Sequence, residues 1–168
     1  MSDDERTHPS KVADDRASLT SFLDYQRSTL AMKCAGLTSE QLKQKALPTS
    51  GLTLLGLVRH AASVERSWFR WIMNAEDVKM PWPGKVDGTF AEFHVEDADV
   101  DEAFEVWRQE CTRARAVASS FNSLDDTVDF RGETISLRYV LTHMIEEYAR
   151  HNGHADLLRE AIDGAVGE

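Results

Sequence analysis

Apolar residues recur every three or four positions over four long stretches of the chain. This spacing matches the turn of an amphipathic α-helix, and no stretch shows the strong alternation that is typical of strands. A capping-box pattern, Thr38-Ser-Glu-Gln41, predicts a further short helix through about Lys45. The pattern therefore predicts an all-α four-helix bundle with a short extra helix before the second long one. The four long helices are expected over residues 14–35, 52–75, 100–121 and 137–162.

The segments between these helices carry turn residues and charge. Weak alternation around Gly132, over residues 124–135, predicts a short pair of extended segments. Residues 87–102 contain seven acidic side chains and no Lys or Arg, which favours a solvated loop followed by a helix N-terminus. The polar residues 1–12 predict a flexible tail. Because the sequence shows no internal repeat and no low-complexity segment, residues 1–168 are expected to form a single domain.

The last predicted helix places ionisable groups on its apolar face. At about 100° per residue, the positions on this face form one stripe. The stripe contains Val140, His143, Met144, Glu147, His151, His154, Leu158 and Ile162. An ionised carboxylate on a core-facing stripe is costly unless a positive group meets it. A metal ion would meet this need, and so would a buried hydrogen bond from a histidine or from Arg150. Glu146, one step along the helix, points to the flank.

The second long helix also turns a histidine inward. Its apolar stripe passes through Leu57, His60, Val64, Trp68 and Trp71. On the opposite flank this phase places Arg59, Arg66 and Arg70. With Glu147 and His151, His60 makes a set of two histidines and one carboxylate. Three protein ligands leave a coordination position open, as in catalytic metal sites. Zinc suits this set, and so do non-haem iron, nickel and manganese.

Composition and charge exclude several classes of function. A net charge of −10 argues against a nucleic-acid-binding surface. The longest charge-free run of note, Ala46 to Val58, has 13 residues, whereas a helix needs about 20 to span a membrane. The N-terminus lacks the basic and apolar regions of a secretory signal, and the two cysteines, Cys34 and Cys111, lie among apolar neighbours. The chain is therefore expected in the cytoplasm, with both thiols buried.

Two motifs connect the chain with a known family. The segment Gly56-Leu-Val-Arg-His60-x-x-x-Val-Glu65 and the later Glu147-x-x-x-His151-Asn-Gly-His154 resemble the DinB-like superfamily. The resemblance is greatest to an actinobacterial branch related to mycothiol-dependent maleylpyruvate isomerases and mycothiol S-transferases. It covers nearly the whole chain, including the Leu37-Thr-Ser-Glu-Gln41-Leu turn.

The resemblance implies a four-helix bundle whose metal is held by one histidine of the second helix and two ligands of a later helix. Carried over to this chain, it gives His60, Glu147 and His151. It also implies thiol transfer, in which the metal lowers the pKa of a small thiol, with mycothiol the first candidate, for attack on an electrophilic small molecule. Arg150 and His154 are the candidate cofactor-binding residues. His143 and His154 would equally fit as supporting core histidines.

Two other functions stay open at this point. A metal-binding stress or detoxification protein would use the same ligands without turnover. A purely structural bundle would neutralise Glu147 with Arg or His. Four tryptophans and the habit of the family also suggest a homodimer.

Overall fold

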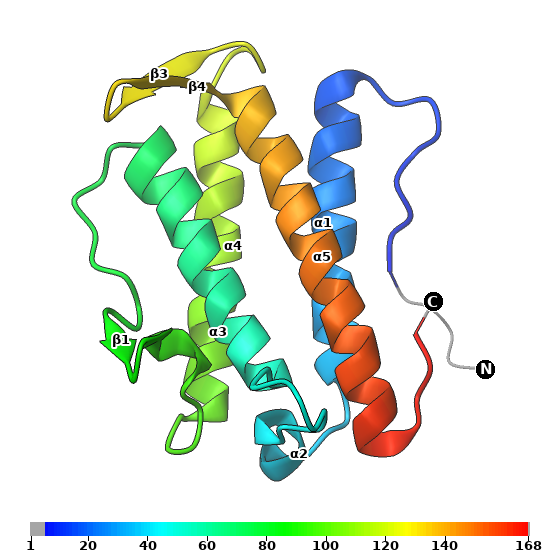
Figure 1. Ribbon diagram of the computed structural model, residues 1–168. Coiled ribbons are helices and arrows are strands. Elements are labelled where there is room, and N and C mark those ends of the chain that lie inside the picture. The colour runs from blue at the N-terminus through cyan, green and yellow to red at the C-terminus, as the bar shows by residue number, and fades with distance from the viewer. Residues whose placement is uncertain (1–5, 168) are drawn as a thin grey trace.

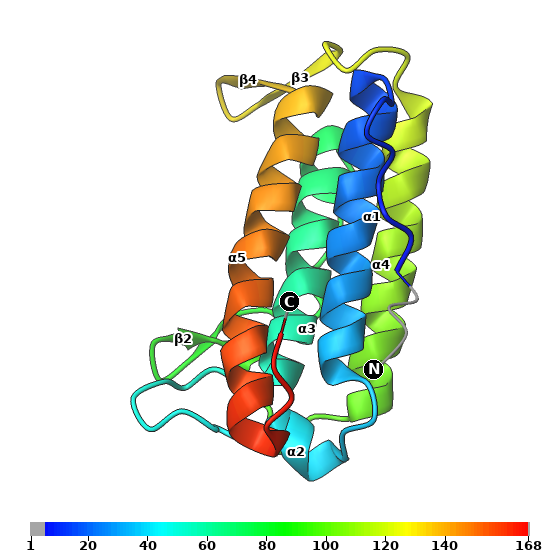
Figure 2. The same cartoon turned by 90° about the vertical axis from the view of Figure 1, so that its right-hand side faces the viewer.

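The computed structural model describes residues 6–167, and its four long rods confirm the all-α architecture. The rods stand side by side along one axis (Figures 1 and 2). They are α1 (Asp15–Cys34), α3 (Leu54–Glu65) with its π-helical continuation η1 (Arg66–Met73), α4 (Val100–Ser120) and α5 (Leu137–Asp163). The shorter elements are α2 (Ser39–Lys43), the strands β1 (Lys85–Val86), β2 (Thr89–Phe90), β3 (Thr127–Phe130) and β4 (Glu133–Ser136), and the 3₁₀ turn η2 (Ala91–Phe93).

Side-chain caps fix where the helices begin. Asp14 accepts a hydrogen bond from Ala17 N, and Ser136 accepts one from Tyr139 N. The predicted capping box of α2 is present, with Thr38 and Gln41 each bonded to the other's backbone. Each cap satisfies backbone N–H groups that the first turn leaves without partners, so the predicted starts agree closely with the observed ones. Residues 6–12 form no helix, and the rest of the predicted flexible tail lies outside the described residues.

The helices pack as two principal pairs. α1 lies chiefly against α5, and α3 against α4, while α3 and α5 face each other across the front of the bundle (Figure 1). Leucines supply much of the fully buried core, and all four long helices contribute to it. Buried apolar side chains of this size each contribute on the order of 1.5–3 kcal/mol to folding. The α3–α5 seam is the one that carries the inward-facing histidines.

The second long helix is not α-helical throughout, contrary to the sequence prediction. From Arg66 it continues as a π-helix, in which Asn74 N bonds the carbonyl five residues back, at Phe69. A wider turn changes which side chains face the core. Phe69 is fully buried, whereas Trp68 is only half-buried.

The predicted outward flank of this helix is also wrong. Arg66 and Arg70 are largely covered, and both bond the carboxylate of Glu110 on α4. Arg59 is buried as well, and it donates to the backbone carbonyl of His94. A helix-wheel argument treats charged residues as solvent-facing. Here an acid on the neighbouring helix draws the guanidinium groups inward.

Two short hairpins lie in the connections between the long helices, one between η1 and α4 and the other between α4 and α5. β3 and β4 pair antiparallel, which confirms the predicted extended pair. β1 and β2 form a second hairpin, in a region where the sequence analysis predicts a loop. Asp87 and Gly88 both have positive φ in its turn, as do Arg131 and Gly132 in the other. The Asp-Gly pair is a hairpin signal that was present in the sequence.

A buried polar cluster joins the four long helices. The guanidinium of Arg27 on α1 bonds both carboxylate oxygens of Glu65 on α3, each at 2.7 Å. The Tyr148 hydroxyl of α5 donates to the same carboxylate at 2.8 Å, and Trp107 Nε1 of α4 donates to that hydroxyl at 2.8 Å. Burial and the charge of Glu65 raise the pKa of Tyr148 well above its ordinary value, so the phenol stays a donor.

The Glu65→Gln variant should lose about 3–5 kcal/mol of unfolding free energy, because it leaves the Arg27 charge buried without a counter-charge. Urea denaturation followed by circular dichroism measures this. The control is Glu105→Gln, which breaks a pair whose side chains are 62% and 55% exposed (Arg108 and Glu105). That change should cost no more than about 1 kcal/mol. Equal losses in the two variants would contradict a structural role for the buried pair.

Candidate metal centre

Three side chains from α3 and α5 meet in the seam between the two helices. His60 Nε2 lies 2.9 Å from Glu147 Oε1, and His151 Nε2 lies 3.3 Å from the same oxygen. One ligand atom from each residue lies within 4.8 Å of the others. Glu147 and His151 share a face because they are one turn apart on α5. Each of the three side chains is just under one-fifth exposed.

The donor set and its spacing fit a divalent metal. Bonds of about 2.0–2.2 Å at tetrahedral angles place ligand atoms about 3.4 Å apart. The 3.3 Å between His151 Nε2 and Glu147 Oε1 is already close to this value. The 2.9 Å between His60 and Glu147 is a hydrogen-bond distance, which a bound ion would widen slightly. The three residues predicted from their stripes are thus brought together.

A fourth residue, which the sequence analysis missed, holds His60 from behind. Glu92 Oε1 lies 2.7 Å from His60 Nδ1, and its side chain comes from the 3₁₀ turn η2. Glu92 is buried, although it belongs to the acidic run expected to be solvated. A carboxylate on Nδ1 fixes the ring and its proton so that Nε2 faces the other two ligands. The only sequence signal was an acid within an acidic run, which does not distinguish Glu92 from its neighbours.

Burial and neighbouring side chains shift the pKa values of all three candidate ligands. Burial lowers the pKa of His60, but hydrogen bonds to Glu92 and Glu147 outweigh burial and leave this pKa raised. Burial raises the pKa of Glu147, but the His60 hydrogen bond and the charge of His151 outweigh it and leave this pKa lowered. Burial and the nearby His60 lower the pKa of His151. These shifts favour the charged forms of His60 and Glu147 and the neutral ring of His151.

The other candidate residues lie at different distances from this centre. His154 contacts a candidate ligand directly, with its Nδ1 3.3 Å from His151 Nδ1. Arg150 is exposed and pairs with Glu146 on the flank of α5. His143 packs its ring 4.5 Å from the ring of Trp68. A cofactor-binding role for Arg150 and His154 stays a prediction.

A cavity adjoins His60, one of the three converging residues. Its volume is about 620 Å³.

 A second cavity, of about 420 Å³, lies elsewhere in the bundle. His60 and Glu92 form part of the wall of the larger cavity, and the rest comes from α3, η1 and the segment 79–90. Cavities of this size accept small organic molecules.

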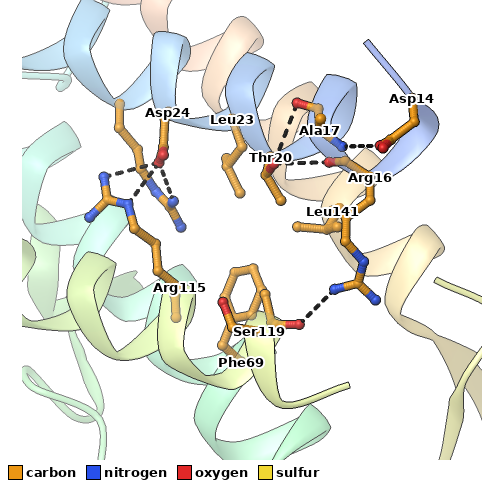
Figure 3. A pocket seen from close by; sticks show the side chains of 13 residues that line it. Asp14, Arg16, Ala17, Thr20, Leu23, Asp24, Phe69, Arg115, Ser119 and Leu141 are labelled. Atoms are coloured by element: carbon orange, nitrogen blue, oxygen red, sulfur yellow. Dashed lines mark hydrogen bonds and ion pairs between the residues drawn. The ribbon is translucent and has the colours of Figure 1, made fainter. Parts of the chain in front are cut away.

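The separate cavity lies between α1 and α4 and offers no comparable chemistry (Figure 3). Its charged groups already have partners within the protein. Arg16 donates to the backbone carbonyls of Ala118 and Phe121, and Arg115 pairs with Asp24. None of the three converging side chains lines this cavity.

Neither cysteine is placed to act as a nucleophile. Both are buried, as predicted. Burial raises the pKa of the Cys34 thiol to about 12, and burial with the charge of Glu65 raises that of Cys111 to about 12. At neutral pH both therefore stay protonated and unreactive.

Comparison with known families gives a result that agrees with this geometry. The model of the family described as Mycothiol-S-transferase matches residues 18–164. The chain belongs to the mycothiol-S-transferase family. A search of curated proteins finds no match. Within residues 6–167, no helix combines the length and the apolar character needed to cross a membrane. The match spans all four long helices, and the family's name indicates a transferase-type enzyme acting with a thiol.

Glu147→Gln should lower metal affinity by more than about a hundredfold, because an amide replaces the only anionic group among the three residues. Isothermal titration of the metal-free protein with zinc measures the affinity. Glu146→Gln is the matched control and should leave affinity unchanged, because that side chain points away to Arg150. Glu92→Gln should fall between them, with a loss of about ten- to a hundredfold. Metal loss in the Glu146 variant alone would refute this assignment.

The two cysteines should resist iodoacetamide in the folded protein at pH 8. With pKa values of about 12, their thiolate fraction is about a thousandfold below that of a free cysteine. The rate should rise with pH, since the thiolate is the reacting form. Mass spectrometry after timed labelling measures it, and urea-unfolded protein is the control. Rapid labelling without urea would contradict the buried, protonated state.

Proposed function

We propose that this protein is a divalent-metal-dependent thiol S-transferase, in which His60, Glu147 and His151 hold the metal. The observation that carries the proposal is the convergence of these three side chains in a chain of the mycothiol-S-transferase family. The co-substrates are a small thiol of the mycothiol type and an electrophilic small molecule. Zinc is the first choice of metal, while nickel, iron and manganese accept the same ligand set.

A metal held there would act as a Lewis acid that lowers the pKa of an incoming thiol, so that the thiol loses its proton near neutral pH. The protein's own residues prepare this position. Glu92 holds the Nδ1 proton of His60, which turns Nε2 toward Glu147. Burial and the nearby His60 lower the pKa of His151, which favours the neutral ring whose lone pair can bind a metal.

The thiol must come from outside the chain. Cys34 and Cys111 are buried and protonated, and neither is among the residues that line the cavity beside the site. In the transfer itself, the sulfur of the thiol forms a bond to the electrophilic atom. The leaving group departs with its bonding pair, and the thiol proton passes to solvent.

A structural bundle is the rival that one observation favours. Glu147 already accepts from His60 at 2.9 Å, so its charge has a partner without any metal. Metal analysis of protein purified without a histidine tag separates this rival from the proposal. A metal-binding protein without turnover is separated by the conjugation assay below. A homodimer and a cytoplasmic location stay predictions.

Removing the metal with a chelator should lower the rate of conjugation between mycothiol and monochlorobimane at pH 7 by at least about thirtyfold. This factor is the ratio between full ionisation and the few per cent of thiolate that a free thiol has at this pH. Bimane fluorescence measures the rate, and adding zinc back is the control. An unchanged rate after complete removal, verified by metal analysis, would refute metal-dependent transfer.

A further inference from the structure

The cavity of about 620 Å³ is lined by His60, the candidate ligand on α3, and its other walls combine aromatic and basic side chains. Aromatic rings form much of the wall, and two lysines join them. We propose that this cavity binds the electrophile and selects flat, apolar molecules that carry an anionic group such as a carboxylate. The inference rests on the proposed function and names the substrate class of the same site. The residues that carry it are Ser63, Trp68, Lys79, Trp82, Lys85 and Phe90.

The aromatic rings are held in place by neighbours outside the cavity. The guanidinium of Arg59 lies 4.5 Å from the ring centre of Trp82, and the ring of His143 lies 4.5 Å from that of Trp68. Rings fixed in this way offer flat apolar surface at little entropic cost. A flat apolar body is the ligand shape that such walls bind best.

The two lysines supply positive charge without an internal counter-charge. Among residues 6–167, no carboxylate lies within 4.0 Å of the ammonium group of Lys79 or Lys85. Lys85 Nζ instead lies 4.8 Å from the ring centre of Phe90. The carboxylate on the cavity wall, Glu92, is taken by His60. An anionic group of a bound molecule would therefore meet two ammonium groups that the protein does not neutralise.

A buried hydroxyl on the wall offers a further polar contact. Ser63 is more than nine-tenths buried, and its Oγ has no hydrogen-bond partner among the described residues. A buried hydroxyl in this state costs free energy unless a partner reaches it. Because Ser63 lines the cavity one turn after His60, a polar group of a bound electrophile could satisfy it close to the candidate metal centre.

The same walls suit the thiol less well. A thiol carried on a polyhydroxylated sugar needs many hydrogen-bonding partners, and this cavity offers mainly apolar surface. The chosen probe reaction is a substitution on an aromatic ring. The sulfur bonds the ring carbon that carries chlorine, chloride leaves with the bonding pair, and the thiol proton passes to solvent. No oxidant or reductant is needed.

The test compares 4-chloro-3-nitrobenzoate with 4-chloro-3-nitrobenzamide, which share the reacting carbon and differ in charge. Lys79→Gln and Lys85→Gln should each raise KM for the benzoate about two- to fivefold, the range expected for an exposed charge pair. The double variant should show roughly the product of the two. KM for the benzamide and for the thiol should stay unchanged. Lys11→Gln, which removes a charge outside the cavity, is the matched control.

Binding is also measured directly, by calorimetry with the benzoate in the absence of thiol and in chelator-treated protein, because a carboxylate can itself ligate a metal. Binding that weakens in the double lysine variant, and not in Lys11→Gln, supports the inference even if no conjugation occurs. Lysine-dependent binding without conjugation would refute the proposed thiol transfer but still support the inference about the cavity. A rise in the KM of the thiol alone, or equal binding of benzoate and benzamide, would overturn the inference.

Discussion

The ion pair between Arg27 and Glu65 is the interaction on which the rest of the structure depends. The carboxylate of Glu65 receives a guanidinium from α1 and a hydroxyl from α5, and that hydroxyl receives the indole N–H of α4. Glu65 itself ends α3, so all four long helices meet at one buried charge. Tyr148 directly follows Glu147 in the chain. The contact that fixes α5 against α3 therefore also sets how the candidate metal ligands face each other.

The buried carboxylates fall into two groups according to their partners. Glu65 and Glu110 are held by arginines, whose charge is permanent in proteins. Glu92 and Glu147 are held by His60, whose proton is exchangeable at physiological pH. A metal can take the place of that proton, whereas it cannot replace an arginine without leaving a buried charge. The proposed metal chemistry therefore fits the seam where a histidine, and not an arginine, is the partner of the carboxylates.

The spacing of apolar residues along the chain predicted which side chains of the regular helices face the core. His60, Glu147 and His151 were found because each lies on the apolar stripe of its helix, and Glu146 was set aside for the same reason. Glu92 was missed because a 3₁₀ turn positions it, and such a turn leaves no periodic signal. The burial of the Arg66 side chain could not be predicted either, because its partner Glu110 lies on another helix. These failures all concern contacts between distant segments, which local pattern does not encode.

One segment between η1 and α4 connects binding with chemistry. Residues 79–90 supply the lysines and much of the aromatic wall of the cavity, and the turn that follows supplies Glu92, which holds His60. The helices supply the three candidate ligands from a packed core, which resists displacement. In the proposed assignment, a change in this segment would alter which electrophile binds, while Glu65 and Arg27 keep α3 in place. Glu92 contacts the candidate ligand His60 and also lines the cavity, so in the proposed assignment it couples selectivity to metal geometry.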